Sequence, residues 1–573
     1  MTHLTTTLPP SQGQVHADAG RKRSRWPGMR IACSIESCIV GASLFFTLFV
    51  NQRFWHAWAA GQDWSRAEGW FLAVAVAVLL TAVHSLILGL VLGLAPGRRA
   101  AKPVLGALFI VTALAMHYMN RYTVFFDAEM VRNIFHTDVR EAGELLTGGM
   151  LGDVLVYGGL PALLLSRVDF PRRSLRRALA MRALFVAAAT LVAGASLLVA
   201  FQDLSGLLRN QKEVRYLVTP ANFIVASIRV LTAETGETGL PRLPVGADAV
   251  AASVAHGGKP RLLVVVVGET VRAANWGLNG YQRQTTPELA ASDVINFPHV
   301  TACGTNTEVS LPCMFSPYGR RHYDEKQIRR HESVLHVMEH AGIKTLWRDN
   351  QSGCKGVCDG LEVQRPEEQP EPRLCKGNHC LDEILLSGLE SALQRNPRDL
   401  VIVLHQLGNH GPAYSQRYPD AFRRFMPTCD EPDLGKCSRE QIVNSYDNAL
   451  LYTDHFLAQA LQRLQVQGTH EAALIYVSDH GESLGENGVY LHGLPYAIAP
   501  REQTEVPMLL WLSPGFAGAS GIDAACLRAR AAQPASHDYL FHTMLGLMQV
   551  QTAAYDGAFD LLDGCRGRAR AGA

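Results

Sequence analysis

Five long apolar stretches in the first two hundred residues place the strongest constraint on how this chain folds. They cover roughly 31–50, 71–95, 103–119, 149–166 and 183–201. A helix of about 20 apolar residues crosses a hydrocarbon core of about 30 Å, so each stretch is close to the length that spans a membrane. Asp153 makes the fourth stretch the weakest of the five. We therefore expect a multi-pass, five-helix transmembrane domain over residues 21–202, and its first span is too long for a signal-peptide core.

The charges between these stretches predict their orientation. Basic residues fill three segments, which are 21–30, 98–102 and 167–177. The two remaining loops are neutral or acidic. Because cytoplasmic loops collect Lys and Arg, this alternation predicts five crossings with a cytoplasmic N-terminus. Everything after residue 201 then lies on the outer side of the membrane.

The segments that flank the predicted spans have other compositions. Residues 1–20 are polar and without periodicity, so we expect a disordered tail. Residues 203–260 mix amphipathic pieces such as Asn222–Leu231 with glycine and proline, which favours an interfacial bridging helix and linker. Across the chain, 53 Lys and Arg balance 52 Asp and Glu. That balance argues against nucleic acid as a partner, because no strong field would follow a phosphate backbone.

From residue 261 to residue 573 the pattern changes to short β-branched runs separated by helical lengths. The runs are 262–267, 400–404, 473–477 and 507–512, with 344–347 a weaker candidate. Such runs are typical of strands that are buried on both faces of a parallel sheet. We therefore expect an α/β domain with a central, mostly parallel sheet.

Polar clusters follow the first three of these runs. They are Gly268-Glu269-Thr270, His405 to Pro412, and Ser478 to Glu482. Taken singly, such residues are most often helix caps, turn residues or loop histidines. The carboxyl ends of parallel strands meet at one edge of a sheet, so we expect the three clusters to converge there. A convergence of Glu, Asp and His side chains indicates a metal site.

A hydroxyl-rich segment, Thr301–Ser316, lies between the first two clusters and leads into a predicted helix. The N-terminus of a helix suits a phosphate. A threonine hydroxyl is a weak nucleophile unless a base or a metal activates it. Glu269, Asp479 and His480 with a threonine oxygen would give a mixed oxygen and nitrogen sphere, for which zinc is suitable and manganese is the alternative.

These motifs resemble those of the lipid A phosphoethanolamine transferases, a family within the alkaline phosphatase and sulfatase superfamily. The resemblance covers nearly the whole chain, including the five-span anchor. The matching motifs, in chain order, are Gly268-Glu-Thr, Cys303-Gly-Thr-Asn-Thr307, Pro312-Cys-Met-Phe-Ser316, Cys354-Lys-Gly, Asn409-His-Gly-Pro412, Ser478-Asp-His-Gly-Glu-Ser-Leu-Gly-Glu-Asn-Gly488 and Tyr490-Leu-His-Gly-Leu-Pro-Tyr-Ala497. The resemblance implies an inner-membrane, metal-dependent enzyme with a periplasmic catalytic domain.

The resemblance also implies roles for individual residues. Thr307 is the nucleophile that becomes phosphorylated, and it shares one or two zinc ions with Glu269, Asp479 and His480. Positions that contact the phosphoethanolamine or a second metal are matched by Lys355, His410 and His492, and the two histidines are also candidates for the general acid.

A set of positions that the family uses for the donor head group is matched by Asn133, Thr137, Glu141 and Ser352. The first three are spaced four residues apart, which predicts one helical face. An amphipathic surface helix is the alternative interpretation.

The reaction that the resemblance implies is a double displacement. Thr307 takes phosphoethanolamine from phosphatidylethanolamine, diacylglycerol leaves, and a phosphate group of lipid A then takes the group from the threonine. The modified outer membrane binds cationic antimicrobial peptides such as polymyxin less well.

Several questions stay open at the level of sequence. Glu308 stands where the family more often has a small residue, and three roles are open to it: to point away from the site, to cap the helix, or to shift the energetics of the nucleophile and the metal. Thr305 is the nucleophile if the register is misread. A related head-group transferase, such as a glycerol-phosphate transferase, would share the architecture. A non-catalytic membrane scaffold would be expected to have lost metal ligands or the nucleophile, and the sequence keeps all of them. A sulfatase would need a Cys-x-Pro-x-Arg segment, which the sequence lacks.

Ten of the twelve cysteines lie beyond residue 300. In an oxidising compartment such cysteines form disulfides more readily than a structural zinc site. Short loops close easily, so we expect nearest neighbours to pair, and the last two to pair by elimination: Cys303 with Cys313, Cys354 with Cys358, Cys375 with Cys380, Cys429 with Cys437, and Cys526 with Cys565. Cys33 and Cys38 lie in the first span and are expected to stay unpaired.

Overall fold

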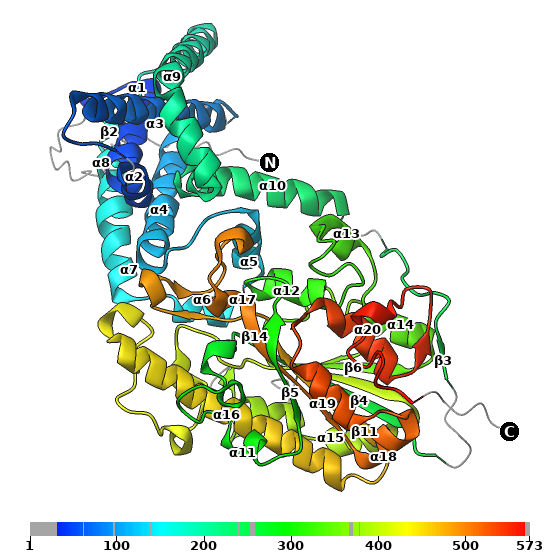
Figure 1. Ribbon diagram of the computed structural model, residues 1–573. Coiled ribbons are helices and arrows are strands. Elements are labelled where there is room, and N and C mark those ends of the chain that lie inside the picture. The colour runs from blue at the N-terminus through cyan, green and yellow to red at the C-terminus, as the bar shows by residue number, and fades with distance from the viewer. Residues whose placement is uncertain are drawn as a thin grey trace, which may run out of the picture.

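A computed structural model describes residues 31–60, 62–94, 98–137, 139–237, 241–252, 258–365, 371–376 and 379–567. A bundle of long helices lies at one end, and an α/β domain, here called the outer domain, lies at the other (Figure 1). The two-part fold predicted from the sequence is confirmed. The tail expected to be disordered, residues 1–20, lies outside the described residues.

Four helical segments of the described chain are long and apolar enough to cross a membrane. They are α3 (Ala67–Leu94), α4 (Arg98–Tyr122), the run Gly148–Ser166 and α9 (Leu175–Asn210). The third run joins α7 (Gly148–Asp153), a π-helical turn (Val154–Gly159) and α8 (Leu160–Ser166). The predicted first span becomes a fifth crossing only if α1 (Ile35–Phe45), its π-helical extension (Phe46–Val50) and α2 (Gln52–Ala59) are taken together.

The first span is bent by 60° between Val50 and Gln52. Asn51 lies at the bend, where its side chain donates a hydrogen bond to the carbonyl of Thr219 at 2.7 Å and accepts one from the Thr219 amide at 2.7 Å. Its amide also donates to the Phe46 carbonyl at 2.9 Å, a backbone group that the helix end leaves open. The pattern of apolar residues does not reveal the contact with Thr219, since that partner lies far along the chain.

Shorter helices connect the bundle to the outer domain. α5 (Ala128–His136) and α6 (Val139–Glu144) follow α4. A 3-10 helix (Lys212–Leu217) and α10 (Ala221–Glu237) follow α9 and lead toward the outer domain (Figure 1). The expected amphipathic helix around Asn222–Leu231 therefore forms, with Ile228 and Leu231 more than half exposed on one side.

The outer domain is built on an eight-stranded sheet with the order β15-β5-β14-β11-β4-β10-β6-β7. The strands in chain order are β4 (Arg261–Gly268), β5 (Ile295–Thr301), β6 (Lys344–Asp349), β7 (Val363–Gln364), β10 (Leu400–His405), β11 (Glu471–Ser478), β14 (Glu505–Leu512) and β15 (Ala535–Ser536). All five predicted runs are strands of this sheet.

The directions of the strands refine the prediction. β14 runs antiparallel to both of its neighbours, and the other strands run in one direction. Burial on both faces, which β14 shares with the parallel strands of the sheet, does not reveal the direction of a strand. β5 was missed, because its exposure alternates and Pro298 interrupts the run.

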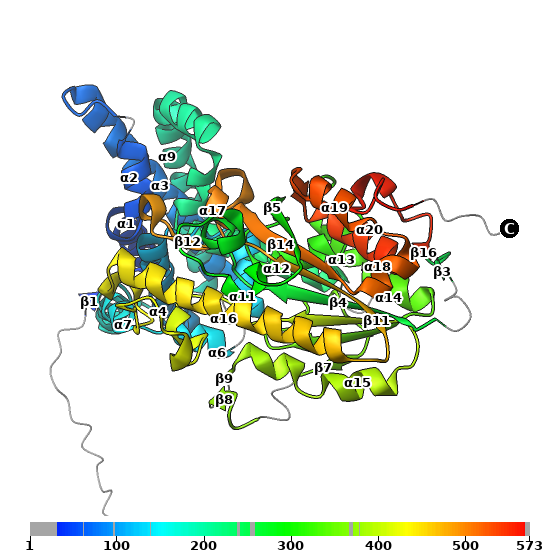
Figure 2. The same cartoon turned by 60° about the horizontal axis from the view of Figure 1, so that its bottom comes forward.

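Helices cover both faces of the sheet (Figure 2). On one face Leu262, Val264 and Val266 of β4 pack toward α15 (Leu389–Arg395) and α16 (Arg439–Val466). The alternate residues Leu263, Val265 and Val267 pack on the other face. That face is covered by α12 (Thr307–Met314), α14 (Val334–His340), α18 (Pro514–Ser520), α19 (Ala524–Ala531) and α20 (Asp538–Leu547).

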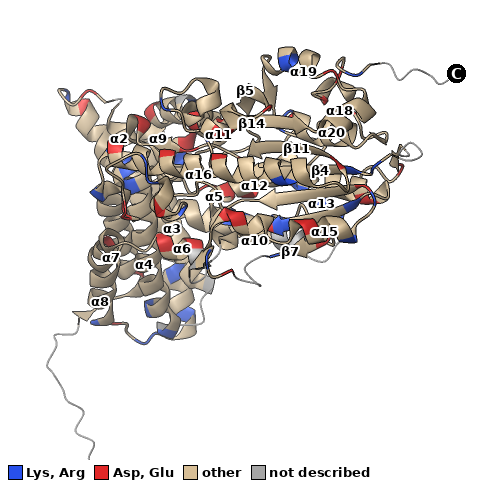
Figure 3. Ribbon diagram, turned by 90° about the horizontal axis from the view of Figure 1, so that it is seen from below, with Lys and Arg blue, Asp and Glu red and all other residues tan. Residues whose placement is uncertain are grey.

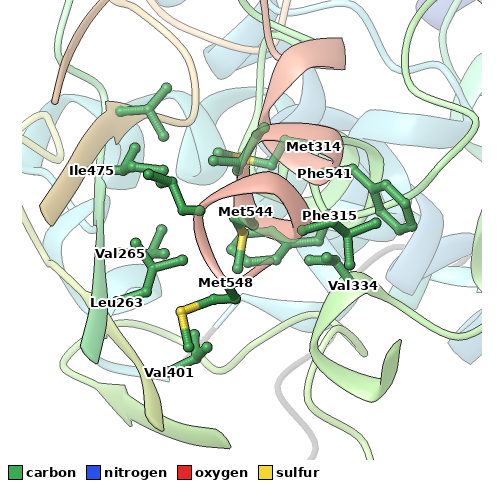
Figure 4. Packing of buried hydrophobic residues seen from close by; sticks show 14 of the residues in the cluster. Leu263, Val265, Met314, Phe315, Val334, Val401, Ile475, Phe541, Met544 and Met548 are labelled. Atoms are coloured by element: carbon green, nitrogen blue, oxygen red, sulfur yellow. The ribbon is translucent and has the colours of Figure 1, made fainter. Parts of the chain in front are cut away.

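Figure 4 shows the packing on the second face at the level of side chains. Leucine, valine and isoleucine from β4, β10 and β11 lie opposite Met544 and Met548, with Phe315 and Phe541 beside them. Burying one such side chain contributes about 1.5–3 kcal/mol. This core fixes α12 against the sheet, and α12 carries Thr307.

The five expected disulfides are present in the structure. They join Cys303 to Cys313, Cys354 to Cys358, Cys375 to Cys380, Cys429 to Cys437, and Cys526 to Cys565. Cys33 and Cys38 are free thiols.

Candidate active site and metal centre

The polar clusters after β4 and β11 meet at the carboxyl edge of the sheet. The two strands are adjacent and parallel, with Gly268 opposite Ser478, so Glu269 and Asp479 follow at neighbouring positions. His480 Nε2 lies 3.3 Å from Glu269 Oε1 and 3.3 Å from Asp479 Oδ2. All three side chains are fully buried.

β5 and the first turn of α12 bring Thr307 to the same place. β5 points in the same direction as β4, so its end at Thr301 lies at the same edge. The Asn306 side chain caps α12 and sets Thr307 as its first residue. Thr307 Oγ1 lies 3.0 Å from Glu269 Oε2 and 3.4 Å from His480 Nε2.

Glu269, Asp479 and His480 fit a divalent cation. Each offers one ligand atom, and these atoms lie within 4.8 Å of one another. Asp479 Oδ2 is buried and has no hydrogen-bond partner among the described residues. A buried carboxylate oxygen of this kind is costly unless a cation binds it. With the Thr307 hydroxyl, the donors are oxygen and nitrogen atoms, which suit zinc or manganese.

The three groups shift one another's pKa. Burial and the charge of Glu269 raise the pKa of Asp479 to about 6. Burial acts to lower the pKa of His480, but the nearby carboxylates outweigh it and raise that pKa to about 9. Burial acts to raise the pKa of Glu269, yet its hydrogen bond with His480 brings that pKa below the ordinary value. At neutral pH the metal-free cluster is two carboxylates beside one imidazolium, which attracts a cation.

His410 and His492 stand next to the cluster. The His492 ring centroid lies 4.4 Å from that of His480 and 5.6 Å from that of His410. His492 Nδ1 lies 2.8 Å from Glu482 Oε2, so a carboxylate orients this ring. Burial lowers the pKa of His410 to about 3, and its ring is neutral at pH 7. The two imidazoles therefore differ in the chemistry that they can supply.

A cavity of about 460 Å³ opens on Thr307 and continues into the helical bundle. Its polar end includes Gln351, Ser352, His410 and His492. Its remaining walls are mostly apolar side chains from α4, α5, α6 and α10. A cavity with one polar end and one apolar end suits an amphiphile.

The predicted head-group residues Asn133, Thr137 and Glu141 all line this cavity, but not from one helical face. α5 ends at His136, Thr137 is extended (φ −71°, ψ 133°), and Glu141 belongs to α6. Thr137 Oγ1 donates to the Asn133 carbonyl at 2.6 Å, which is the acceptor that the Thr137 amide would use in a continued helix. The prediction of a single helical face was therefore wrong, and a break between two helices brings the three residues to the cavity.

The remaining predicted residues are Ser352, Lys355 and Thr305. Ser352 lines it, and Lys355 Nζ lies 2.8 Å from Ser352 Oγ. Thr305, the alternative nucleophile, donates its hydroxyl to the Leu494 carbonyl at 2.7 Å. Its hydroxyl is therefore used to hold the loop that carries His492.

Sequence reasoning missed Gln351, whose Nε2 donates to Glu269 Oε2 at 2.9 Å. It follows β6, whose run was the weakest strand candidate, and the same edge argument would have found it. His405 belongs to the predicted polar cluster but pairs with Asp349 at 2.7 Å instead of joining Glu269. Both members of that pair are buried.

Glu308 contacts a different set of residues from Thr307. Its carboxylate lies 3.0 Å from His136 Nδ1 and 2.6 Å from Arg329 Nη2, in α13 (Glu325–Arg330). Burial acts to raise the pKa of Glu308, but the hydrogen bond from His136 and the charge of Arg329 lower it. Of the roles considered from the sequence, Glu308 takes that of a residue directed away from the metal ligands.

The chain matches two family models. The model described as "Sulfatase" matches residues 261–550, and the model described as "Phosphoethanolamine transferase EptA/EptB" matches residues 74–235. The division falls near the boundary between the helical part and the outer domain.

Curated relatives and a solved structure agree with the family models. Phosphoethanolamine transferase EptA of Escherichia coli strain K12 is 41% identical over 469 residues, which cover 81% of this chain and 86% of that protein. Phosphatidylethanolamine transferase Mcr-1 of Escherichia coli is 38% identical over 489 residues, or 82% of this chain and 88% of that protein. The integral membrane lipooligosaccharide phosphoethanolamine transferase A of Neisseria meningitidis superposes with a TM-score of 0.88 at 36% identity, covering 94% of this chain and 100% of that one. The resemblance seen in the motifs is thereby confirmed, and the chain belongs to the EptA/EptB family of phosphoethanolamine transferases within the alkaline phosphatase and sulfatase superfamily.

Proposed function

We propose that this protein transfers phosphoethanolamine from phosphatidylethanolamine to a phosphate group of lipid A, through a phosphoethanolamine group carried on Thr307. The observation that carries the proposal is the position of the Thr307 hydroxyl. It lies 3.0 Å from the Glu269 carboxylate, at the polar end of a cavity whose apolar walls come from the helical bundle. Relatives that are 41% and 38% identical carry the names phosphoethanolamine transferase and phosphatidylethanolamine transferase.

In the proposed enzyme a metal ion would be held by Glu269, Asp479 and His480, together with the Thr307 oxygen. Zinc suits these donors, and manganese remains the alternative. A cation bound there supplies the positive charge that makes the threonine hydroxyl more acidic and hence a better nucleophile. Gln351 supports the centre because its amide orients Glu269.

In the first half-reaction Thr307 Oγ1 attacks the phosphorus of phosphatidylethanolamine and the bond to diacylglycerol breaks. The proton of the hydroxyl passes to the Glu269 carboxylate, to which Thr307 Oγ1 donates a hydrogen bond at 3.0 Å. Diacylglycerol leaves as an alkoxide that needs a proton. His492 is the better-placed donor, since the Glu482 carboxylate orients its ring at 2.8 Å, whereas burial lowers the pKa of His410 to about 3. Such acid assistance is worth about 10²–10⁴-fold in rate.

In the second half-reaction a phosphate oxygen of lipid A attacks the same phosphorus and the bond between phosphorus and Thr307 Oγ1 breaks. The threonine oxygen takes back the proton held by Glu269, and His492 regains its proton from solvent. The head group of the donor is held by Asn133, Thr137, Glu141 and Ser352, which line the cavity, with Lys355 beside Ser352. Because both substrates are lipids, the apolar walls toward the bundle explain why the reaction site adjoins a membrane domain.

The proposed topology places the outer domain in the periplasm and the N-terminus in the cytoplasm, within the inner membrane. Figure 3 shows Lys and Arg gathered at the end of the bundle that carries α8. The positive-inside rule puts that end in the cytoplasm. Modified lipid A carries an added amine, so the cell surface would bind polymyxin less well.

The proposal is tested by mass spectrometry of the protein and of lipids. Full-length protein in phosphatidylethanolamine vesicles is expected to gain the mass of phosphoethanolamine on Thr307, and cells that express it are expected to carry phosphoethanolamine on lipid A. An unmodified Thr307 together with unmodified lipid A would refute the proposal. A glycerol-phosphate product would instead support the related head-group transferase, and a metal analysis of the purified protein identifies the ion.

A further inference from the structure

The α5–α6 segment contacts the outer domain through one side-chain pair at the C-terminal end of each helix. At the α5 end, His136 Nδ1 lies 3.0 Å from Glu308 Oε1. At the α6 end, Glu144 pairs with Arg417. The Glu308 side chain is 1% exposed and also pairs with Arg329 at 2.6 Å, whereas His136 is 40% exposed. The Arg417 and Glu144 side chains are 2% and 8% exposed, so the second pair is the more buried one. Exposed ion pairs contribute little, but breaking a buried one is costly because the remaining charge loses its partner.

The His136–Glu308 and Glu144–Arg417 contacts are here called joints. Each joint includes a residue that is directly bonded to, or hydrogen-bonded with, a residue of the reaction site. Glu308 follows Thr307 in the first turn of α12, so movement of one displaces the other. Arg417 Nε donates to the backbone carbonyl of His410 at 2.7 Å, while its Nη2 holds Glu144. The helix-bundle side of the cavity and the nucleophile side are therefore joined through two charged contacts.

The α5–α6 segment that carries both joints forms a wall of the cavity. Asn133, Thr137 and Glu141 line the cavity from this segment. Neither Glu308 nor Arg417 is among the described residues that line it. Both can act on the reaction only through their neighbours.

We propose that Glu308 and Arg417 are positioning residues, which hold the donor-binding wall of α5–α6 in register with Thr307 and His410. The inference rests on the proposed function and deepens it, because it explains how a lipid held largely by the bundle meets a nucleophile on the outer domain. Displacement of a bound reactant by about 1 Å can cost about 10²-fold in rate. Loss of either joint is therefore expected to slow the chemical step while the cavity still binds the donor.

The variants are chosen to remove one charge and keep the shape. Glu308→Gln weakens the first joint together with the Arg329 pair, His136→Gln removes the first joint alone, and Glu144→Gln opens the second. Asp399→Asn is the matched control, since Asp399 pairs with Arg261 at the opposite edge of the sheet. That pair is also buried, with Arg261 8% and Asp399 12% exposed. His136→Gln, alone and combined with Glu308→Gln, tests whether the two residues act as one unit.

The experiment follows phosphoethanolamine on Thr307 by intact mass in a single turnover of full-length protein in phosphatidylethanolamine vesicles. Glu308→Gln and Glu144→Gln are expected to lower the rate constant about 10- to 100-fold, with the final modified fraction unchanged. The double variant is expected to react no more slowly than Glu308→Gln alone. Asp399→Asn is expected to lower thermal stability and keep the wild-type rate constant.

Two results would overturn the inference while the proposed function stands. One is a wild-type rate constant in both joint variants, and the other is a reduced modified fraction at an unchanged rate constant, which indicates misfolding. If the wild-type chain itself gains no mass on Thr307, the proposed function fails instead. Hydrogen exchange of residues 128–144 gives a readout without turnover: exchange is expected to be faster in Glu308→Gln than in Asp399→Asn, and equal exchange contradicts the joint.

Discussion

Withdrawing the metal from the proposed centre is expected to leave a proton in its place. In the metal-free cluster the carboxylates of Asp479 and Glu269 raise the pKa of His480 from 6.5 to about 9. At about 1.4 kcal/mol for each pH unit, that difference is worth about 3 kcal/mol. The sign follows from the raised pKa: the stabilisation is complete below pH 6.5 and is lost as the pH rises through about 9.

A cation must displace this proton before His480 can bind it. At pH 7 only about one His480 ring in a hundred is neutral if its pKa is about 9. The apparent affinity for zinc is therefore expected to be about 10²-fold weaker at pH 7 than for the neutral ring, and to rise about tenfold for each pH unit. Below pH 6 the slope is expected to steepen, since burial and Glu269 raise the pKa of Asp479 to about 6.

The assay is calorimetric titration of chelator-treated, full-length protein with zinc, between about pH 6.5 and pH 8, with a competing chelator of known affinity. Buffers with different ionisation enthalpies count the released protons, and about one proton per zinc ion is expected at pH 7. His480→Gln is the control, because it removes the titrating ring and is expected to abolish most of the slope. A zinc affinity that is independent of pH, or binding without proton release, would refute the reasoning.

Three further predictions follow from the described contacts. Thr307→Ala is expected to lower turnover by more than about 10⁴-fold and to prevent mass gain on the protein. Thr307→Ser keeps a hydroxyl and is expected to keep part of the activity, so an equal loss in both variants would count against a nucleophilic role. Gly481→Ala would place its Cβ 2.1 Å from the Glu502 carbonyl oxygen, so we expect a loss of about 1–3 kcal/mol in unfolding free energy, and an unchanged melting temperature would contradict that packing. Asp349→Asn is expected to cost about 3 kcal/mol or more near pH 6, because the Asp349 carboxylate raises the pKa of buried His405 despite desolvation. That cost, measured as a difference in thermal stability, is expected to shrink as the pH rises through the raised pKa of His405, and a cost that grows with pH would reverse the sign of the argument.

The strands that carry the metal ligands could be predicted because their signal is local. A run such as Leu262–Val267 is apolar at every position, and only a strand buried on both faces explains so short a run followed by a charged residue. Parallel strands place their carboxyl ends at one edge, so chain direction predicts that Glu269 and Asp479 lie at the same edge, and the adjacency of β4 and β11 brings them into contact. The disulfides between close cysteines are predictable for a similar reason, since short loops close at low entropic cost.

The contacts between the bundle and the outer domain were decided by tertiary structure. The spacing of Asn133, Thr137 and Glu141 matches a helical face, yet the Thr137 hydroxyl ends the helix and a second helix supplies Glu141. The direction of β14 is equally invisible, because burial on both faces is the same for either direction.

Sequence by itself determined the two-part fold, the order of the motifs and the residue types of the centre, because hydropathy and strand composition act over a few neighbouring residues. Tertiary structure alone decided which distant charges meet. Glu308 stands out in the motif as an unexplained carboxylate, and only the packing of α5 against α12 shows that His136 lies 3.0 Å from it. The physical reason is that an ion pair depends on separation in space, and a single chain records separation only along its length.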